Sequence, residues 1–171
     1  MRMTGWMVAA AMALATTPAM AAEEKMLDLS NPETVAAAVK DAGYKAELKT
    51  NDKGEPFISS STNGSEFTIE FYGCEEKINC GSFQFYSWYK KDPFYTLELV
   101  NDWNAKKRFM KLAIDSDGDM GQYMDFSSVG LFNQKAFADM LDWYTVMDAE
   151  LGKFLSEKRE AAPAADAGAK K

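Results

Sequence analysis

Histidine is missing from this chain of 171 residues, so the side chain that most often moves protons near neutral pH is absent. The chain therefore also lacks the most frequent metal ligand and the usual serine and cysteine triads. Neither a G-x-x-x-x-G-K phosphate loop nor a G-x-G-x-x-G dinucleotide motif occurs. We predict no catalytic residues, no enzyme activity and no cofactor, although carboxylates, lysines and tyrosines remain available.

Positive charge is also scarce. The 19 lysines and arginines are outnumbered by 26 aspartates and glutamates, which gives a formal net charge of −7. Nucleic-acid binding requires clustered cations, and the only dense basic run is Lys106-Lys107-Arg108, which we interpret as a solvated helix end. We therefore expect no nucleic-acid partner.

Long apolar runs are confined to the N-terminus. Arg2 precedes the apolar run 7–15, and Ala19-Met20-Ala21 follows as an A-x-A cleavage site. This run is too short to cross a hydrocarbon layer of about 30 Å as a helix. We predict a cleaved signal peptide over 1–21, no membrane span after cleavage, and a periplasmic or secreted protein. Loss of Arg2 would shift the net charge from −7 to −8.

Only two cysteines occur, Cys74 and Cys80, in a C-x5-C arrangement flanked by glycines. This spacing differs from the C-x2-C pairs of zinc and thioredoxin sites. In an oxidising compartment the pair predicts a structural disulfide across a hairpin end. A redox-active pair is the alternative, but Glu75 and Glu76 would oppose the lowered thiol pKa that it needs.

Caps, turns and hydrophobic periodicity predict an α+β fold in the order α-β-β-β-β-α-β-β-α, with an antiparallel sheet flanked by helices. The strand that begins at Pro56 should lie at a sheet edge. We expect a linker at 22–30, a domain at 31–158 and a disordered Ala/Pro-rich tail at 159–171. The expected helices are 32–42, 92–104 and 133–158, and the expected strands are 44–50, 56–62, 66–72, 82–89, 108–115 and 120–127.

Aromatic residues alternate along the strands 66–72 and 82–89. Their phenylalanines face one side, whereas Tyr72, Tyr86 and Trp88 face the other. If helices cover the phenylalanine side, these three side chains form an open platform for a sugar or peptide. The alternative is an ordinary sheet surface or a partly covered second core.

The last predicted helix carries apolar residues beyond its main stripe. Trp143 lies off the stripe, and Met147 and Phe154 lie near its margin, which favours an oligomer or partner contact, such as a homodimer. Burial within one domain is the alternative. Asp148 interrupts the stripe. It fits either a buried, paired carboxylate or, as we expect, the edge where the helix leaves the domain.

The segment 115–119 resembles the start of a calcium-binding loop. Asp115, Asp117 and Asp119 supply oxygens at positions 1, 3 and 5. Position 6 is Met120 instead of glycine and position 12 is Phe126 instead of glutamate, so the match ends there. We favour a hairpin turn, with a calcium site as the alternative and no other metal site.

The stretch 99–104 (LVNDWN), followed by Arg108-Phe109, a strand, an Asp117-Gly118 turn and a returning strand, resembles the YbjN family, over about 31–154. The resemblance implies a fold similar to type III secretion chaperones and a non-catalytic, often dimeric binding module. The family is described as a sensory transduction regulator. Many members lack an export signal, whereas this chain carries one.

The leading hypothesis is an exported, non-enzymatic interaction module, regulatory or chaperone-like, that binds a protein or peptide through its sheet or a helix face. The alternative is a small-ligand binder that holds a glycan or peptide on Tyr72, Tyr86 and Trp88. A carboxylate hydrolase ranks third.

Overall fold

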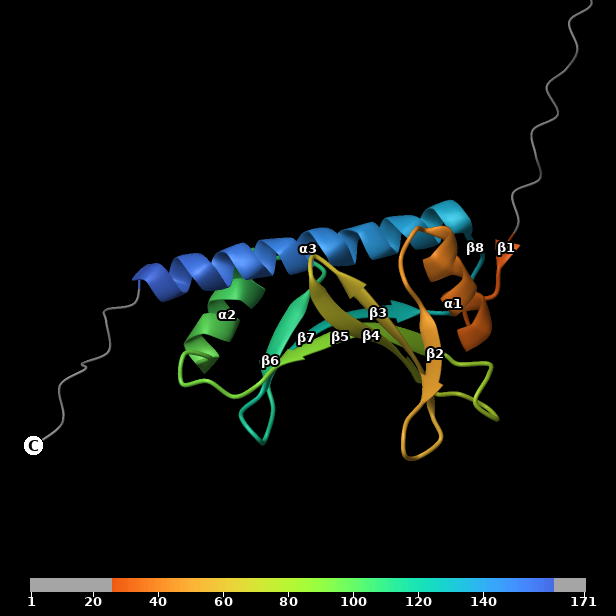
Figure 1. Cartoon of the computed structure of the whole chain (residues 1–171), viewed down its shortest axis with the longest axis horizontal. Helices are drawn as coiled ribbons and strands as arrows, with labels where there is room; N and C mark the ends of the chain where they lie inside the picture. The colour runs from red at the N-terminus through yellow and green to blue at the C-terminus, as the bar shows by residue number, and fades with distance from the viewer. Residues whose placement is uncertain (1–25, 162–171) are drawn as a thin grey trace, which may run out of the picture.

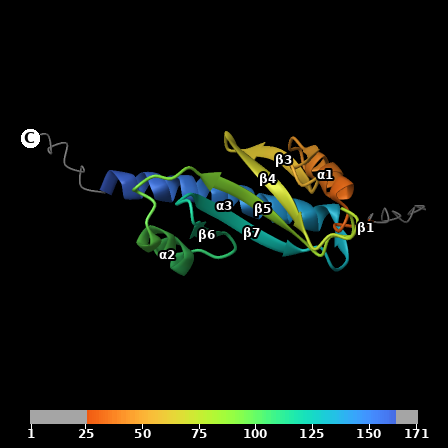
Figure 2. The same cartoon turned by 90° about the horizontal axis from the view of Figure 1, so that it is seen from below.

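One long helix lies along one face of an antiparallel sheet, and no helix of residues 26–161 covers the other face. The computed structural model describes residues 26–161. Helix α3 (Gln134–Ala161) runs the length of the sheet, with α1 (Pro32–Asp41) and α2 (Leu97–Lys106) near its opposite ends (Figure 1). Seen from below, the strands lie in front of α3 (Figure 2). The predicted α+β class is confirmed.

The main sheet has six strands in the order β2-β3-β4-β5-β7-β6, and every neighbouring pair is antiparallel. The order predicted from the sequence is found, with two short additions, β1 and β8, that pair with each other. The strands are β1 (Met26–Leu27), β2 (Glu47–Thr50), β3 (Pro56–Thr62), β4 (Ser65–Tyr72), β5 (Ser82–Tyr89), β6 (Lys111–Ile114), β7 (Met120–Ser127) and β8 (Phe132–Asn133).

Strict alternation places the core between the sheet and α3. Phe67 and Ile69 of β4 are buried, as are Phe83 and Phe85 of β5, while the residues between them point to the opposite face. From above, α3 contributes Tyr144, whose ring centroid lies 4.7 Å from that of Phe67 and 5.3 Å from that of Phe85. This packing fixes which face of the sheet is covered.

Helix α1 forms where its cap residues predict. The side chain of Asn31 accepts a hydrogen bond from the backbone of Glu33, and Pro32 occupies the first turn, where no backbone donor is needed. Gly43 follows with a φ of 90°, which glycine adopts at little cost. The last helix also agrees with the prediction but extends beyond 158 to Ala161.

The start of the second helix was predicted wrongly. Asp92 caps only a single turn, accepting a hydrogen bond from the backbone of Phe94. The helix begins at Leu97, where Thr96 has an extended backbone and accepts a hydrogen bond from the backbone of Leu99. Two successive capping signals therefore compete, and the second one starts the helix.

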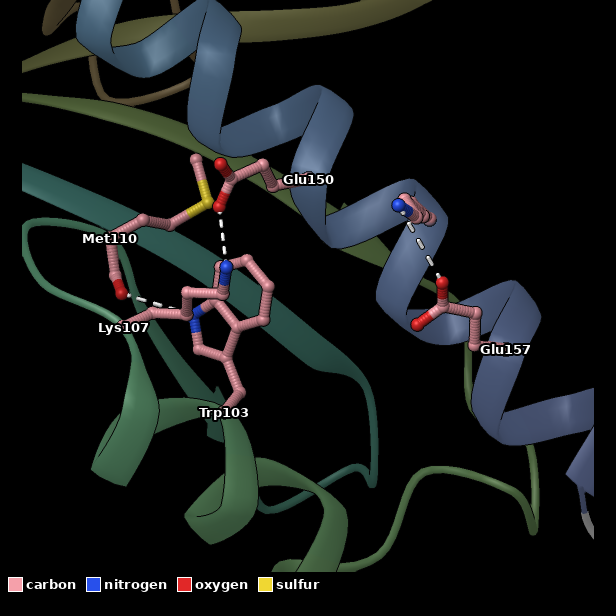
Figure 3. A network of polar contacts seen from close by, with 6 residues as sticks. Trp103, Lys107, Met110, Glu150 and Glu157 are labelled. Carbon is pink, nitrogen blue, oxygen red and sulfur yellow. Dashed lines mark hydrogen bonds and ion pairs between the residues drawn. The ribbon is translucent and has the colours of Figure 1, made fainter.

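Helix α2 is fixed against both β6 and α3 (Figure 3). The indole nitrogen of the buried Trp103 donates a hydrogen bond to the carbonyl oxygen of Met110 over 3.1 Å. Lys107 forms an ion pair with Glu150 of α3, 2.6 Å apart. A buried tryptophan whose only donor is satisfied can anchor a short helix strongly.

The strand β3 is not at an edge, in contrast to the prediction. It pairs with β2 on one side and β4 on the other. Pro56 is tolerated because it is the first residue of the strand, opposite Thr50 at the end of β2. The two edge strands of the sheet, β2 and β6, are also shorter than predicted and begin at Glu47 and Lys111.

The segment predicted as a linker takes part in the fold. Within it, β1 pairs with β8, and Leu29 is fully buried in the core. A single leucine next to a helix cap carries no periodicity, so no pattern in the chain indicated this contact. The predicted signal peptide (1–21) and the residues of the predicted tail beyond 161 lie outside the described residues.

Candidate functional site

The face of the sheet opposite α3 carries the aromatic residues that were predicted to form a platform. We call it the open face and define it by the outward residues of β3, β4, β5 and β7. Tyr72 is 44% exposed and Trp88 54% exposed, and Tyr86 is half-buried between its neighbours. The structure thus places all three on the same uncovered side of the sheet.

A fourth aromatic residue, Tyr123 of β7, joins this platform. It lies opposite Tyr86, and the two ring centroids are 5.2 Å apart. Its hydroxyl group covers Gly121, where a Cβ atom would lie 2.2 Å from the hydroxyl oxygen. The sequence analysis missed Tyr123, although the alternation of β7 around the inward Met124 would have placed it outward.

A row of hydrogen-bonded polar side chains crosses the same face. Tyr72 donates to the carboxylate of Glu70 over 2.8 Å, and Gln84 donates to Asp125 over 2.6 Å. The strand register places Glu70, Gln84 and Asp125 side by side on β4, β5 and β7. Two carboxylates are therefore held in fixed positions at the surface.

The tyrosines of this face are held in their neutral form. Burial raises the pKa of Tyr72 above its usual value, and the hydrogen bond to Glu70 raises it further. The pKa of Tyr86 is also raised, first by burial and then by Tyr123 and Glu70. The pKa of Tyr123 is raised first by burial and then by Asp115 and Glu70. Neutral phenols beside carboxylates can donate hydrogen bonds and present π faces, but they do not act as bases at neutral pH.

Two hollows indent the open face and share Thr68 and Glu70 as lining residues. The first has a volume of about 590 Å³ and extends towards Cys74 and Lys77. The second has a volume of about 540 Å³ and lies beside Glu66, Tyr86 and Trp88. Both volumes are within the range of small-molecule and side-chain pockets, roughly 300–1,000 Å³.

The predicted disulfide between Cys74 and Cys80 is present, at the end of the β4–β5 hairpin. The backbone N–H of the buried Cys80 donates to the carbonyl oxygen of Ser30, and its own carbonyl accepts a hydrogen bond from the Ser128 hydroxyl. The cross-link therefore lies where the N-terminal segment, the hairpin and the end of β7 meet. It also places Cys74 at the rim of the first hollow.

The three residues proposed as a contact surface on the last helix have different environments. Trp143 is 42% exposed and packs against Phe109, with ring centroids 4.7 Å apart. Met147 is buried in the core, so it belongs to no exposed surface. Phe154 is half-buried and packs against Trp103. The exposed apolar patch on this side therefore consists of Trp143, Phe109 and Val146.

The aspartates of the segment 115–119 form a closed turn. One carboxylate oxygen of Asp115 accepts hydrogen bonds from the backbones of Asp117 and Asp119. Asp119 in turn accepts from the backbone of Lys91, whose ammonium group donates to the carbonyl oxygen of Asp117. Among the described residues these carboxylates do not gather with others around one point. The favoured interpretation as a hairpin turn agrees with this geometry.

A buried polar network, which the sequence analysis did not anticipate, connects β7 to α3. Gln122 is fully buried and donates to Tyr144 over 2.8 Å and to Asp148 over 2.9 Å. Asn63 donates to the other oxygen of Asp148 over 3.1 Å. Asp148 is therefore buried beneath the helix. The expectation that it lies at the edge of the domain is wrong, and the alternative of a buried, hydrogen-bonded carboxylate is the one found. Its partners are amides, so the network is uncharged apart from this carboxylate.

Helix α2 and the β6–β7 hairpin lie within the residues that a known family's model matches. The family model for YbjN, described as "Putative bacterial sensory transduction regulator", matches residues 31–147. The chain belongs to the YbjN family. No curated protein matches it. Among residues 26–161, none of the helices combines the length and apolar character needed to cross a bilayer.

Proposed function

We propose that this YbjN-family protein is an exported, non-enzymatic module that binds a protein or peptide through the open face of its sheet, in a regulatory or chaperone-like role. One observation carries the proposal: Trp88 and Tyr72 are exposed on a face that no helix of the described chain covers, and each lines one of the two hollows in that face. Exposed aromatic residues are enriched at the centres of protein interfaces. The family's description as a regulator is consistent with a protein partner.

The non-enzymatic part of the proposal rests on the groups available. The chain contains no histidine. On the open face, Glu70 is hydrogen-bonded to Tyr72, and Asp125 is hydrogen-bonded to Gln84. These partners position both carboxylates for recognition of a ligand.

Export is supported by two features that are independent of each other. The N-terminus has the charge, apolar run and A-x-A site of a signal peptide. The disulfide between Cys74 and Cys80 is typical of proteins that work in an oxidising compartment. We accordingly propose that the mature protein is periplasmic or secreted.

Site-specific photo-crosslinking tests the proposed face directly. A photoreactive phenylalanine analogue is placed at Trp88 on the open face, at Trp143 on α3, or at Asp52 in the exposed turn between β2 and β3. We expect a discrete adduct from position 88 in the native envelope fraction, and reconstitution of the same adduct with the purified partner. Adducts from position 143 alone would move the interface to α3, and adducts of the protein with itself there would identify a homodimer.

A second function, the binding of a glycan or small peptide, is favoured by the second hollow, which Tyr86 and Trp88 line. Aromatic side chains of this kind stack on the apolar faces of sugars. A fluorescence screen of glycans and peptides, repeated with Trp88→Phe to remove the indole on this face, tests it. A saturable fluorescence change that disappears in that variant would support the small-ligand function. The absence of any fluorescence change across the screen would count against it.

A further inference from the structure

The central strands of the sheet carry charge of one sign only. None of β3, β4, β5 and β7 contains a lysine or arginine, whereas they contain three carboxylates, Glu66, Glu70 and Asp125. All three carboxylates point to the open face, since the residues that alternate with them are buried or face α3. A chain with 19 basic residues therefore places none of them on these strands.

The three carboxylates also lack cationic partners within the described chain. The ion pairs of residues 26–161 join lysines and arginines to other acids, such as Asp102, which contacts both Lys106 and Lys158. On the open face, the carboxylates of Glu70 and Asp125 are hydrogen-bonded to neutral groups instead. Their negative charge is left for an external partner.

The second hollow combines this charge with aromatic rings. It is lined by Glu66 and Glu70 together with Tyr86 and Trp88, and no basic residue contributes to it. The first hollow differs, because Lys77 reaches into its lining. An aromatic face within about 6 Å of a cation attracts it, and adjacent carboxylates strengthen that attraction.

We infer that the second hollow binds a lysine or arginine side chain of a peptide segment lying across the open face. The inference deepens the proposed function and rests on it. Tyr86 and Trp88 would contact the alkyl stem and the charged head, while Glu66 and Glu70 would accept its hydrogen bonds. A partner that carries basic side chains is thereby selected over an acidic or neutral one.

The test uses capped peptides of equal length that carry lysine, glutamine or glutamate at alternate positions. Binding to the full domain is followed by NMR amide shifts and by calorimetry at low and high salt. We expect the lysine peptide to shift amides of β4 and β5 near Glu66 and Tyr86, and to bind more weakly as salt screens the charges. The glutamine peptide should bind roughly tenfold more weakly or not at all.

Matched variants separate a local site from overall charge. Glu66→Gln with Glu70→Gln should weaken the lysine peptide by about tenfold. Asp139→Asn with Asp142→Asn changes the net charge equally on exposed positions of α3 and should leave binding unchanged. The reversal E66K with E70K should transfer binding to the glutamate peptide, which also shows that the altered face is folded.

Equal losses in both pairs of variants, equal binding of lysine and glutamine peptides, or no binding of the lysine peptide would each overturn the inference. The photo-crosslinking experiment at position 88 tests the proposed function independently of these outcomes. A specific adduct at position 88, together with a lysine peptide that binds no better than the glutamine peptide, would mean that the open face binds an uncharged segment. The absence of any adduct at position 88 would instead count against the face itself.

Discussion

The side-chain amide of Asn104 pairs with the backbone of Leu112 as a neighbouring strand would. Its nitrogen donates to the Leu112 carbonyl oxygen and its oxygen accepts from the Leu112 N–H, both over 2.9 Å. Leu112 lies in the edge strand β6, opposite Gln122 of β7, and presents both backbone groups to the outside. Helix α2 therefore closes the centre of this sheet edge, and Trp103 satisfies the neighbouring Met110 carbonyl.

We expect Asn104→Ala to reopen that edge. Two backbone groups of Leu112 would lose their partner, which should lower the free energy of unfolding by about 1–3 kcal/mol. An unpaired edge also invites strand pairing between molecules. Urea unfolding and light scattering on heating measure the two effects. Asn101→Ala, on the exposed side of the same helix, is the matched control. Equal behaviour of both variants would contradict the role of Asn104.

Phe109 has a φ of 66°, a left-handed conformation that costs a non-glycine residue energy. Its ring packs on Trp143. Phe109→Ala and Phe109→Gly both remove the ring, but only glycine removes the backbone strain, so the glycine variant should be more stable by about 1 kcal/mol. Thermal unfolding measures the difference. At Lys153, exposed in α3, the same pair of substitutions should give the opposite order. Alanine being the more stable at position 109 would show that no strain is stored there.

Tyr89 should make stability fall at alkaline pH. Burial, followed by the nearby Asp148, raises the pKa of Tyr89 from its usual value near 10 to about 12. Below pH 10 both states keep the proton. Between about pH 10 and 12 the unfolded chain releases it while the folded chain does not, so stability decreases as pH rises. Because Tyr89 is partly exposed, we expect about 1 kcal/mol from this residue.

Urea unfolding across this pH range, with Tyr89→Phe, tests the origin of the decrease. The variant loses the hydrogen bond to Gln122, so it should be less stable at every pH, but its stability should fall less steeply above pH 10. Burial also raises the pKa of Tyr144, so this residue should still cause part of the decrease in stability with pH in the variant. Parallel curves for the two proteins would rule out a contribution from Tyr89.

Removal of the disulfide should lower stability without unfolding the domain. Cys74 and Cys80 are six residues apart, and closing so short a loop contributes about 2 kcal/mol in the chain-entropy description. We expect Cys74→Ser with Cys80→Ser to lose this amount in urea unfolding, and the reduced wild-type protein to match the variant. A reduced protein as stable as the oxidised one would exclude a stabilising role. Mass spectrometry of the alkylated protein from cells independently reports whether export has occurred.

Features with a local cause were predictable from the sequence. The alternation in β4 and β5 depends only on the two-residue period of a strand, so the buried Phe67 and the exposed Trp88 could be assigned to opposite faces in advance. The cap at Asn31 and the short loop between Cys74 and Cys80 are equally local. In each case residues a few positions apart determine the outcome.

Other features depend on contacts between distant segments. Asp92 and Thr96 are both good helix caps, and only the position of α2 against β6 selects Thr96. The strand β3 is internal because β2 pairs with its free side. Likewise, Tyr123 lies next to Tyr86 only because β7 pairs with β5. The strand β6, which comes before β7 in the chain, lies on the outer side of β7 instead.

The sequence by itself determined the α+β class, the faces of the strands, the cysteine cross-link and the family to which the chain belongs. Tertiary structure alone decided which surfaces stay uncovered. It buried Met147 and Asp148, exposed Trp143 beside Phe109, and gathered Glu66, Tyr86 and Trp88 around one hollow. The physical reason is that periodicity and capping act over a few residues, whereas burial depends on which distant segment packs on each face.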